Sequence, residues 1–415
     1  MLAKELYVFT RSDALLARAQ KVVPHGIYGH QSPKLLTLGS YPSFLARAEG
    51  CRFWDVDGNE YIDFMCAYGP MVVGYRHPRV EAAARAQAEK ADCLDMPGEV
   101  WVDLAELLVD ITPFADWAVF AKNGSDATTW SLAVARAHTG RPKIVMAAGT
   151  YHGVGAWCTP GLAGIPPSAR ADILTFAYND VDDLKRVVDE HRGEIAGVIV
   201  TPFRHEAFHD SEMPAPGFLE GVRALCDQEG IVMIFDDVRA GFRLHLGGSG
   251  EYFGVRPDIT CYCKAIGNGY PLAAGLGRDY LRGAAEQVFF TGSYWTAYVA
   301  MAAGIATIET LRDEGGIERM DAMGKRLREG LDQQARSLGL AVHQSGPPAI
   351  PFMTFVGDAT FEKNRLFCGE CARRGVFFHP HHNWFLSAAH TEADIDETLG
   401  VTEVAFKAVK ERYGG

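Results

Sequence analysis

The sequence predicts an α/β protein with two domains: a large one with a mostly parallel seven-stranded sheet covered on both faces by helices, and a smaller α+β one. Two observations predict this class. Short apolar runs recur between residues 117 and 277, several of them separated by segments with the apolar spacing of helices. The chain has 415 residues, 48% of them hydrophobic, which is more than one average domain needs.

Three segments follow from the changes in pattern along the chain. We expect residues 1–65 to pack with the small domain, residues 66–300 to form the large domain, and residues 301–415 to form the small domain. The first segment contains an expected helix at 11–22, ended by Pro24 and a Gly-rich stretch. It also contains a hairpin, because two alternating apolar runs flank the turn at residues 57–59.

The large domain accounts for all seven expected strands. Their apolar runs end at turn residues and are too short for helices. The expected strands are 117–121, 143–147, 173–176, 195–200, 231–235, 258–263 and 272–277, and the expected helices are 79–91, 100–111, 127–139, 181–191 and 217–229.

The last segment reads as three helices and two short strands. The helices are expected at 297–312, 320–337 and 393–412, and the strands around 353–356 and 377–378. Thr391 followed by Asp394 has the spacing of a capping box that opens the final helix. The CxxC at Cys368 and Cys371 has no second pair at zinc-ribbon spacing, so we expect two small core residues on one helix face.

Charge and composition exclude several classes of function. The formal charge is −12, from 40 basic and 52 acidic residues, which argues against nucleic acid or an anionic membrane as the main partner. The N-terminus lacks the apolar core of a signal peptide, and no stretch is long enough to span a membrane. The nine cysteines are most simply buried thiols in a reducing compartment. We therefore expect a cytoplasmic protein.

Residues 231–276 hold the strongest chemical signal. Asp236 directly follows one apolar run and Lys264 directly follows a second, so both side chains are expected at the carboxyl edge of the sheet, where ligands bind. A carboxylate there suits a protonated pyridine nitrogen, and an amine there suits an aldehyde. The alternative is a salt bridge between the two residues.

Two weaker signals lie near the same edge. Residues 123–126, Asn-Gly-Ser-Asp, follow a strand and open a helix, where Gly124 and Ser125 can hold a phosphate; the alternative is an ordinary helix cap by Ser125. Tyr151 offers a ring to stack on a planar cofactor, although an aromatic residue there can equally be core. Together the signals complement pyridoxal 5′-phosphate.

An ordered series of motifs resembles the class III pyridoxal-phosphate-dependent aminotransferases of fold type I, in their glutamate-1-semialdehyde aminomutase-like branch. The resemblance covers nearly the whole chain. Its motifs are VPHGIYGHQSP, FWDVDGNEYIDF, YGPMVVGYRHP, NGSDATTWSLAVARAHTGR, TYHG, FDDVRAGFR, CKAIGNGYPLAAGLGR and LSAAHTEADIDETL.

The resemblance implies a role for each matching residue around the cofactor ring. Lys264 would form the Schiff base with pyridoxal phosphate and then move the proton between substrate and cofactor carbons. Asp236 would pair with the pyridine nitrogen. Val238 would pack on one face of the ring and Tyr151 on the other. The implied reaction moves an amino group between an amino donor and a carbonyl substrate, both small molecules.

The resemblance also implies a shared phosphate site. Gly124 and Ser125 would hold the phosphate, and a hydroxyl from the neighbouring subunit, at the position of Ser293, would complete it. The protein is therefore expected to be a homodimer with shared active sites.

Departures from the family pattern concern the substrate. An arginine usual after the N-terminal Gly-rich turn, where it would bind a carboxylate, is missing from residues 29–34. Thr201-Pro202 replaces a usual Glu-Pro, and Ala297-Tyr298 replaces a usual Asn-Pro. These changes favour an aminotransferase over an aminomutase that makes tetrapyrrole precursors, although an aminomutase or a racemase would use the same cofactor residues.

Residues 205–209 match HExxH, the zinc-protease motif, which needs both histidines on one helix. The segment lies in a loop between Pro202 and Pro214, so a zinc hydrolase is a remote alternative and no metal is expected. Arg204, His205 or His209 could instead line the entrance to the cofactor pocket, or serve no function.

Other candidates for substrate contacts are rich in rings, which points to an aromatic or cyclic substrate, although such residues also build subunit interfaces. Arg239 could bind a carboxylate or join a structural ion pair, and the Gly- and Pro-rich loop 155–170 could be a mobile lid. The ring-bearing candidates are Tyr28, His30, Trp295 and residues 379–384.

Overall fold

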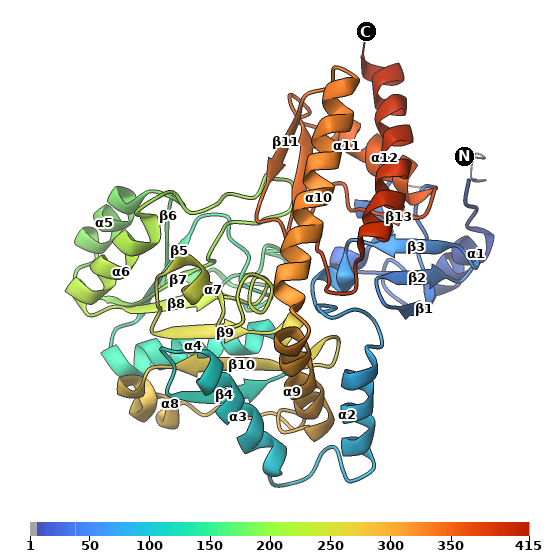
Figure 1. The fold of residues 1–415 in the computed structure, drawn as a ribbon. Coiled ribbons are helices and arrows are strands. Elements are labelled where there is room, and N and C mark those ends of the chain that lie inside the picture. Colours follow the sequence, from blue (N-terminus) through green and yellow to red (C-terminus); the bar gives the residue numbers. More distant parts are fainter. Residues whose placement is uncertain (1–5, 38, 415) are drawn as a thin grey trace. The chain divides into compact units, whose positions relative to one another are not determined.

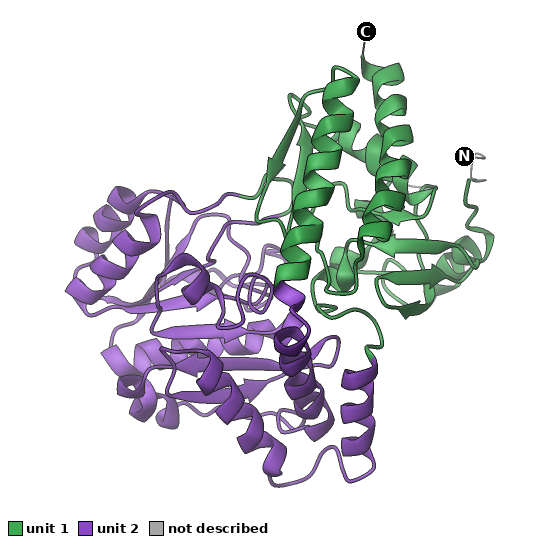
Figure 2. Ribbon diagram, viewed as in Figure 1, with its two compact units in different colours: residues 1–77, 207–211, 318–415 green, residues 78–206, 212–317 purple. Residues whose placement is uncertain are grey.

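The computed structural model describes residues 6–37 and 39–414, so the first five residues and residue 38 of the expected N-terminal segment lie outside it. The chain divides into two compact units (Figure 2). Unit 1 comprises residues 1–77, 207–211 and 318–415, and unit 2 comprises residues 78–206 and 212–317. The domain boundaries expected at residues 65/66 and 300/301 stay a prediction.

Unit 2 is built on a seven-stranded sheet with the order β4-β10-β9-β8-β7-β5-β6 (Figure 1). The five strands from β9 to β6 are parallel, and β10 runs antiparallel to β9 and to β4. The predicted, mostly parallel sheet is confirmed. Its strands are β4 (Trp117–Ala121), β5 (Lys143–Ala147), β6 (Ile173–Phe176), β7 (Ile195–Val200), β8 (Val232–Asp236), β9 (Ile259–Tyr262) and β10 (Ala273–Gly277).

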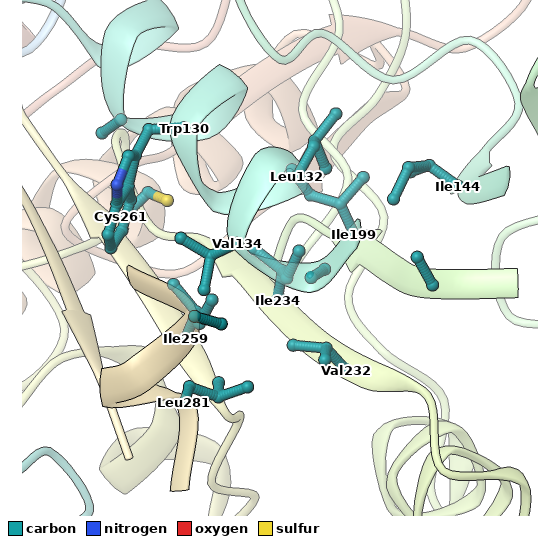
Figure 3. Close-up of a cluster of buried hydrophobic side chains, with 14 of the residues drawn as sticks. Trp130, Leu132, Val134, Ile144, Ile199, Val232, Ile234, Ile259, Cys261 and Leu281 are labelled. Atoms are coloured by element: carbon teal, nitrogen blue, oxygen red, sulfur yellow. The ribbon is translucent and has the colours of Figure 1, made fainter. Parts of the chain in front are cut away.

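Helices pack on both faces of this sheet, because its central strands are apolar on both sides. Every residue of β8 is buried. Val232 and Ile234 join a core cluster with residues of α4 (Gly124–Thr139), drawn in Figure 3. Met233 and Phe235 join the opposite cluster. That cluster includes residues of α5 (Val181–Glu190) and α6 (Phe218–Glu229).

The remaining helices of unit 2 are α2 (Pro78–Ala88), α3 (Glu99–Ile111), α7 (Ser249–Phe253), α8 (Arg282–Gln287) and α9 (Tyr298–Asp313). Helix α9 packs against α2 and α3, and α8 packs against α4. The predicted helices at 79–91, 100–111 and 297–312 are confirmed to within a few residues.

Unit 1 has a four-stranded sheet, β1-β2-β3-β13, and a two-stranded sheet, β11-β12. The predicted hairpin is confirmed: β2 and β3 are antiparallel around residues 57–59, and Asp55 Oδ1 accepts the backbone N–H groups of Asp57 and Asn59, each at 2.9 Å. The strands are β1 (Leu45–Glu49), β2 (Arg52–Asp55), β3 (Glu60–Asp63), β11 (Val342–Ser345), β12 (Phe352–Phe355) and β13 (Val376–Phe377).

The helices of unit 1 are α1 (Thr10–Ala19), α11 (Glu362–Ala372), α12 (Glu392–Tyr413) and nearly all of α10 (Gly316–Ser337). The capping box predicted at Thr391 and Asp394 is present at the start of α12. Cys368 and Cys371 lie buried on α11, as the core interpretation predicted. None of the described helices is long and apolar enough to cross a membrane.

Candidate active site

The site lies at the carboxyl edge of the unit 2 sheet, where β8 and β9 end side by side. Asp236 is the last residue of β8 and is paired in register with Cys261 of β9. Lys264 begins a short 3-10 turn after β9 and has a left-handed φ of 48°. The two strand ends therefore meet, as the sequence predicted. No ion pair joins Lys264 to Asp236 within the described chain, so the salt-bridge alternative is not supported.

Asp236 is paired instead with a histidine that the sequence reasoning gave no role. Its Oδ2 lies 2.8 Å from His152 Nδ1, and its Oδ1 accepts the backbone N–H of Val238 at 3.2 Å. His152 follows β5, which is parallel to the strands that end beside it, and is 2% exposed. The parallel arrangement was the available signal, since it places residues after β5 and β8 at one edge.

Lys264 stands in surroundings that favour its neutral amine. Burial, and after it the charge of the Arg239 guanidinium, lower its pKa to about 7. Arg239 is itself buried, which lowers its own pKa to about 10, and it donates to the carbonyl oxygen of His205 at 2.9 Å. An amine that is neutral near pH 7 can act as nucleophile and as base.

The turn that opens α4, residues 123–126, is compact, and we call it the cradle. Asn123, not Ser125, is the N-cap residue, and its backbone N–H donates to Asp126 Oδ2 at 3.0 Å. The alternative in which Ser125 caps the helix is therefore wrong. Ser125 Oγ accepts the backbone N–H of Val154 at 3.0 Å, which ties the cradle to the segment after β5.

Close approach explains both glycines of this cradle. A Cβ on Gly124 would lie 2.9 Å from both methyl carbons of Val238, and a Cβ on Gly153 would lie 2.3 Å from Ser125 Oγ. Gly153 also has a φ of 116°, which residues with a side chain rarely adopt. The absence of a side chain therefore lets Gly124 pack against Val238 and lets Gly153 pack against Ser125.

The other residues assigned by resemblance occupy distinct places in unit 2. Val238 lies two residues after Asp236 and packs against the α4 core cluster. Tyr151 precedes His152, and 38% of its surface is exposed; burial of the rest raises the pKa of its hydroxyl. Ser293 lies exposed before α9, where its carbonyl oxygen accepts the thiol of Cys93 at 3.0 Å.

The HExxH segment has no helical residue. Phe208, in its middle, has a left-handed φ of 67°, which breaks any helix that would align His205 with His209. No group of three or more His, Cys, Asp or Glu side chains in the described residues could hold a metal ion. The helix that a zinc hydrolase would need at residues 205–209 is therefore not formed.

The candidate substrate residues are divided between the units. In unit 2, Trp295 packs on Phe290 with ring centroids 4.2 Å apart. In unit 1, the rings of His30 and His382 lie edge-on to Tyr68, at 4.5 Å and 5.4 Å, so the sequence reasoning missed Tyr68 as the centre of this cluster. In the expected lid, Trp157 is buried and donates to Thr129 Oγ1 at 3.0 Å. Arg170, at the other end of this loop, donates to the carbonyl oxygens of Ala156 and Thr159, so the mobile lid stays a prediction.

The residues at this edge fit pyridoxal phosphate. The cradle at Gly124 offers the positive end of α4 to a phosphate. Asp236 is a buried carboxylate that can accept from a ring nitrogen, and Lys264 has a lowered pKa suited to an aldehyde.

Comparisons with known proteins agree with this fit. Residues 38–386 match the family model of class-III aminotransferases. An aminopentol aminotransferase of Sphingopyxis macrogoltabida is 45% identical over 96% of this chain and 94% of its own length. A 3-aminobutyryl-CoA aminotransferase of Cloacimonas acidaminovorans is 36% identical over 96% of this chain and 97% of its own length.

A solved structure extends the agreement to the whole fold. The FumI protein of Sphingopyxis sp. MTA144, in its pyridoxal-phosphate internal aldimine form, is 44% identical and superposes with a TM-score of 0.96 over 98% of both chains. The two relatives cover nearly the whole chain, and the family model covers most of it. The chain belongs to the class III aminotransferases, the pyridoxal-phosphate-dependent enzymes of fold type I, and it moves an amino group between an amine and a carbonyl compound.

Proposed function

We propose that the amino donor is an amine without a free carboxylate beside its amino group, and that it carries hydroxyl groups. The observation that carries this proposal is the 45% identity to an aminopentol aminotransferase, whose name describes a polyhydroxylated amine. The second relative is named for a donor whose carboxyl group is held as a thioester. The missing arginine at residues 29–34 agrees, because a bidentate partner for a carboxylate is not provided there.

The proposed roles of the site residues follow from their chemistry. Bound pyridoxal phosphate supplies an aldehyde that takes the amino group and a ring that withdraws electrons from the substrate carbon. Lys264 would hold the cofactor through Nζ, and its amine would carry the proton between the two reacting carbons. Its lowered pKa of about 7 leaves a large fraction of the amine neutral at neutral pH. Asp236 would accept a hydrogen bond from the ring nitrogen and would keep that nitrogen protonated.

The remaining roles position the cofactor. Gly124 and Ser125 bind its phosphate at the N-terminus of α4, where the helix dipole favours a negative charge. Val238 and Tyr151 pack on the two faces of its ring. Contact between Val238 and Gly124, with a hypothetical Cβ only 2.9 Å from the valine methyls, supports a shared wall between the ring and phosphate subsites.

The proposal includes a cytoplasmic homodimer. We expect Ser293 of each subunit to complete the phosphate site of the other. The exposure of Ser293 supports this arrangement, since a residue that serves the partner must lie on the surface of its own subunit. All nine cysteines are free thiols, which suits the reducing cytoplasm.

Half-reactions with single amines test the substrate class. The purified enzyme is mixed with a hydroxylated aliphatic amine, with the same amine lacking hydroxyls, and with alanine and glutamate. The loss of the absorbance of the enzyme-bound pyridoxal phosphate is followed in each case. The hydroxylated amine is expected to react fastest, and a preference for the amino acids would contradict the proposal. Conversion of an amino-aldehyde with no second substrate would instead favour the aminomutase alternative. An aromatic or cyclic carbonyl substrate stays a prediction.

A further inference from the structure

Four rings of unit 1 lie together beside the turn that follows β3. The rings of His30 and His382 lie edge-on to Tyr68, and the ring of His379 lies 6.1 Å from Tyr68 and 5.9 Å from His382. We call these four residues the ring cluster. His30 is exposed, Tyr68 and His382 are half-buried, and His379 is 4% exposed, so one side of the cluster is open to solvent.

The backbone that carries Tyr68 is held in an unfavourable conformation. Cys66, Ala67 and Tyr68 have consecutive left-handed φ values of 48°, 54° and 64°, which cost energy in residues with a side chain. Asp63, the last residue of β3, holds this turn: Oδ1 accepts the backbone N–H of Met65 at 2.7 Å, and Oδ2 accepts that of Cys66 at 3.0 Å. Strain of this kind is typical of ligand sites, where it fixes the place of a side chain.

The buried imidazole of His379 has an N–H group without a partner. Its Nδ1 accepts the backbone N–H of His381 at 3.1 Å, so Nδ1 carries no proton. Burial, and after it the neighbouring His381 and His30, lower the pKa of His379 to about 3, so the ring is neutral and its one proton lies on Nε2. Among the residues that the structure describes, no group accepts this proton. A buried donor without a partner is costly, so a ligand oxygen that accepts from it gains affinity.

Tyr68 supplies the complementary acceptor. Its hydroxyl donates its only proton to the backbone carbonyl oxygen of His30 at 2.8 Å, so the lone pairs of Oη remain to accept. A hydroxyl group both donates and accepts, and it matches a site with one N–H donor and one accepting oxygen. The ring cluster has no aspartate, glutamate, lysine or arginine, so it offers no salt bridge to a carboxylate or an ammonium group.

We propose that the ring cluster binds the hydroxylated chain of the amino donor. His379 Nε2 donates to a hydroxyl oxygen of the substrate, Tyr68 Oη accepts a hydroxyl proton, and the ring faces pack on the neighbouring carbons. The inference rests on the proposed function, in which the donor is a hydroxylated amine without a free carboxylate beside its amino group. It names the two residues that select for the hydroxyls.

The test compares two amines in the enzyme loaded with pyridoxal phosphate: an aliphatic amine with hydroxyl groups, and the same amine without them. His379→Phe keeps a ring but removes the donor. It is expected to lower kcat/KM for the hydroxylated amine about fivefold to tenfold through a higher KM, the loss typical of one hydrogen bond. The amine without hydroxyls should react as in wild type. His379→Gln keeps an N–H donor of similar reach and should restore most of the lost preference.

Tyr68→Phe is expected to lower the preference for the hydroxylated amine by a similar factor, because the ring stays and only the accepting oxygen is lost. Tyr7→Phe is the matched control. Tyr7 is also half-buried in unit 1, and its hydroxyl also donates to a backbone carbonyl oxygen, that of Glu60 at 2.7 Å, outside the ring cluster. This variant should keep the wild-type preference.

Nitrogen NMR of the cofactor-free protein, labelled with ¹⁵N-histidine, reads the donor without any reaction. The His379 signals, assigned by their loss in His379→Gln, are expected to show a protonated Nε2 and an unprotonated Nδ1. The opposite arrangement would overturn the inference, because Nε2 could then only accept.

A preference for the hydroxylated amine that survives in both His379→Phe and Tyr68→Phe would also overturn the inference. So would an equal loss of kcat/KM for the two amines, which marks a structural role. Failure of the proposed function looks different: the wild-type enzyme itself would then react equally well with both amines, and the inference would fall with it.

Discussion

At the scale of single residues, Lys264 is the group whose environment most changes its chemistry. An ordinary lysine is almost fully protonated at neutral pH, with a pKa near 10.4. Burial, and the nearby Arg239 cation, lower the pKa of Lys264 to about 7. The neutral amine, which alone attacks an aldehyde, is therefore abundant at neutral pH.

This lowered pKa predicts the pH dependence of cofactor uptake. Below pH 7 Lys264 is a protonated ammonium and cannot attack; above it the free amine accumulates. The rate at which cofactor-free enzyme takes up pyridoxal phosphate should rise with pH through a midpoint of about 7 and then level off. Stopped-flow absorbance measures this rate. A rate that keeps rising past pH 9 would show an ordinary lysine.

Variants of Arg239 separate the charge effect from burial. Arg239→Gln removes a cation that opposes protonation of Lys264, so the midpoint of the uptake curve should move to higher pH. Arg239→Lys keeps the charge and should leave the midpoint near the wild-type value. Equal midpoints in wild type and Arg239→Gln would refute the electrostatic explanation.

Some residues of the site could be predicted from the sequence. Asp236 and Lys264 were predicted because each directly follows an apolar run. The role of His152 could not be predicted in the same way. It depends on the strand order of β5, β7 and β8, which places the residue after β5 near the end of β8. The interpretation of Ser125 as the helix cap was wrong because the N-cap residue is Asn123, two residues earlier.

At the scale of elements, the junction of β4 and α4 depends on the absence of a side chain at Gly124. A Cβ there meets both methyls of Val238 at 2.9 Å, closer than carbon atoms pack. Gly124→Ala must therefore displace Val238 or the first turn of α4, and both belong to the proposed cofactor site.

Gly124→Ala is expected to weaken pyridoxal phosphate binding by about tenfold or more, in line with the cost of overpacking. Fluorescence titration of the cofactor-free enzyme measures the affinity. Gly283→Ala is the control, because Gly283 lies on α8, outside the proposed site, and a Cβ there meets nothing within 4 Å. An unchanged affinity in Gly124→Ala would show that the cradle does not bind the cofactor.

Elements with strong apolar patterns were predictable and polar ones were not. All seven strands of the large sheet were expected at nearly their observed bounds, since the sheet is buried on both faces. Strand β11 was missed because Val342 is the only large apolar residue among its four. A helix was expected at Cys368 and Cys371, but the bounds of α11 were not predicted, because Asn364 and Gly369 interrupt its apolar spacing.

At the scale of the whole molecule, the strand order is a long-range property. Strand β10 pairs with β4, which lies about 150 residues earlier in the chain, and local patterns do not contain that pairing. The resemblance to a known family supplied the topology, and the implied fold type I is confirmed by a TM-score of 0.96 to a solved relative.

Mixed dimers test the proposal of shared active sites. Lys264→Ala should be inactive, and Ser293→Asp should be nearly so because a carboxylate repels the phosphate. After the two variants are unfolded and refolded together, a mixed dimer pairs the Lys264 of one subunit with the Ser293 of the other. Activity should reappear in one site of each mixed dimer. If the mixture stays inactive while size-exclusion chromatography shows dimers, Ser293 does not serve the neighbouring subunit.

The central claim is that Lys264 holds the cofactor, and borohydride reduction tests it most directly. Reduction of the loaded enzyme makes the linkage permanent, and mass spectrometry of a digest then locates it. The cofactor adduct is expected on the peptide that contains Lys264, and Lys264→Ala is expected to lose both the adduct and the activity. An adduct on another lysine, such as the half-buried Lys122 beside the cradle, or activity that survives in Lys264→Ala, would contradict the account.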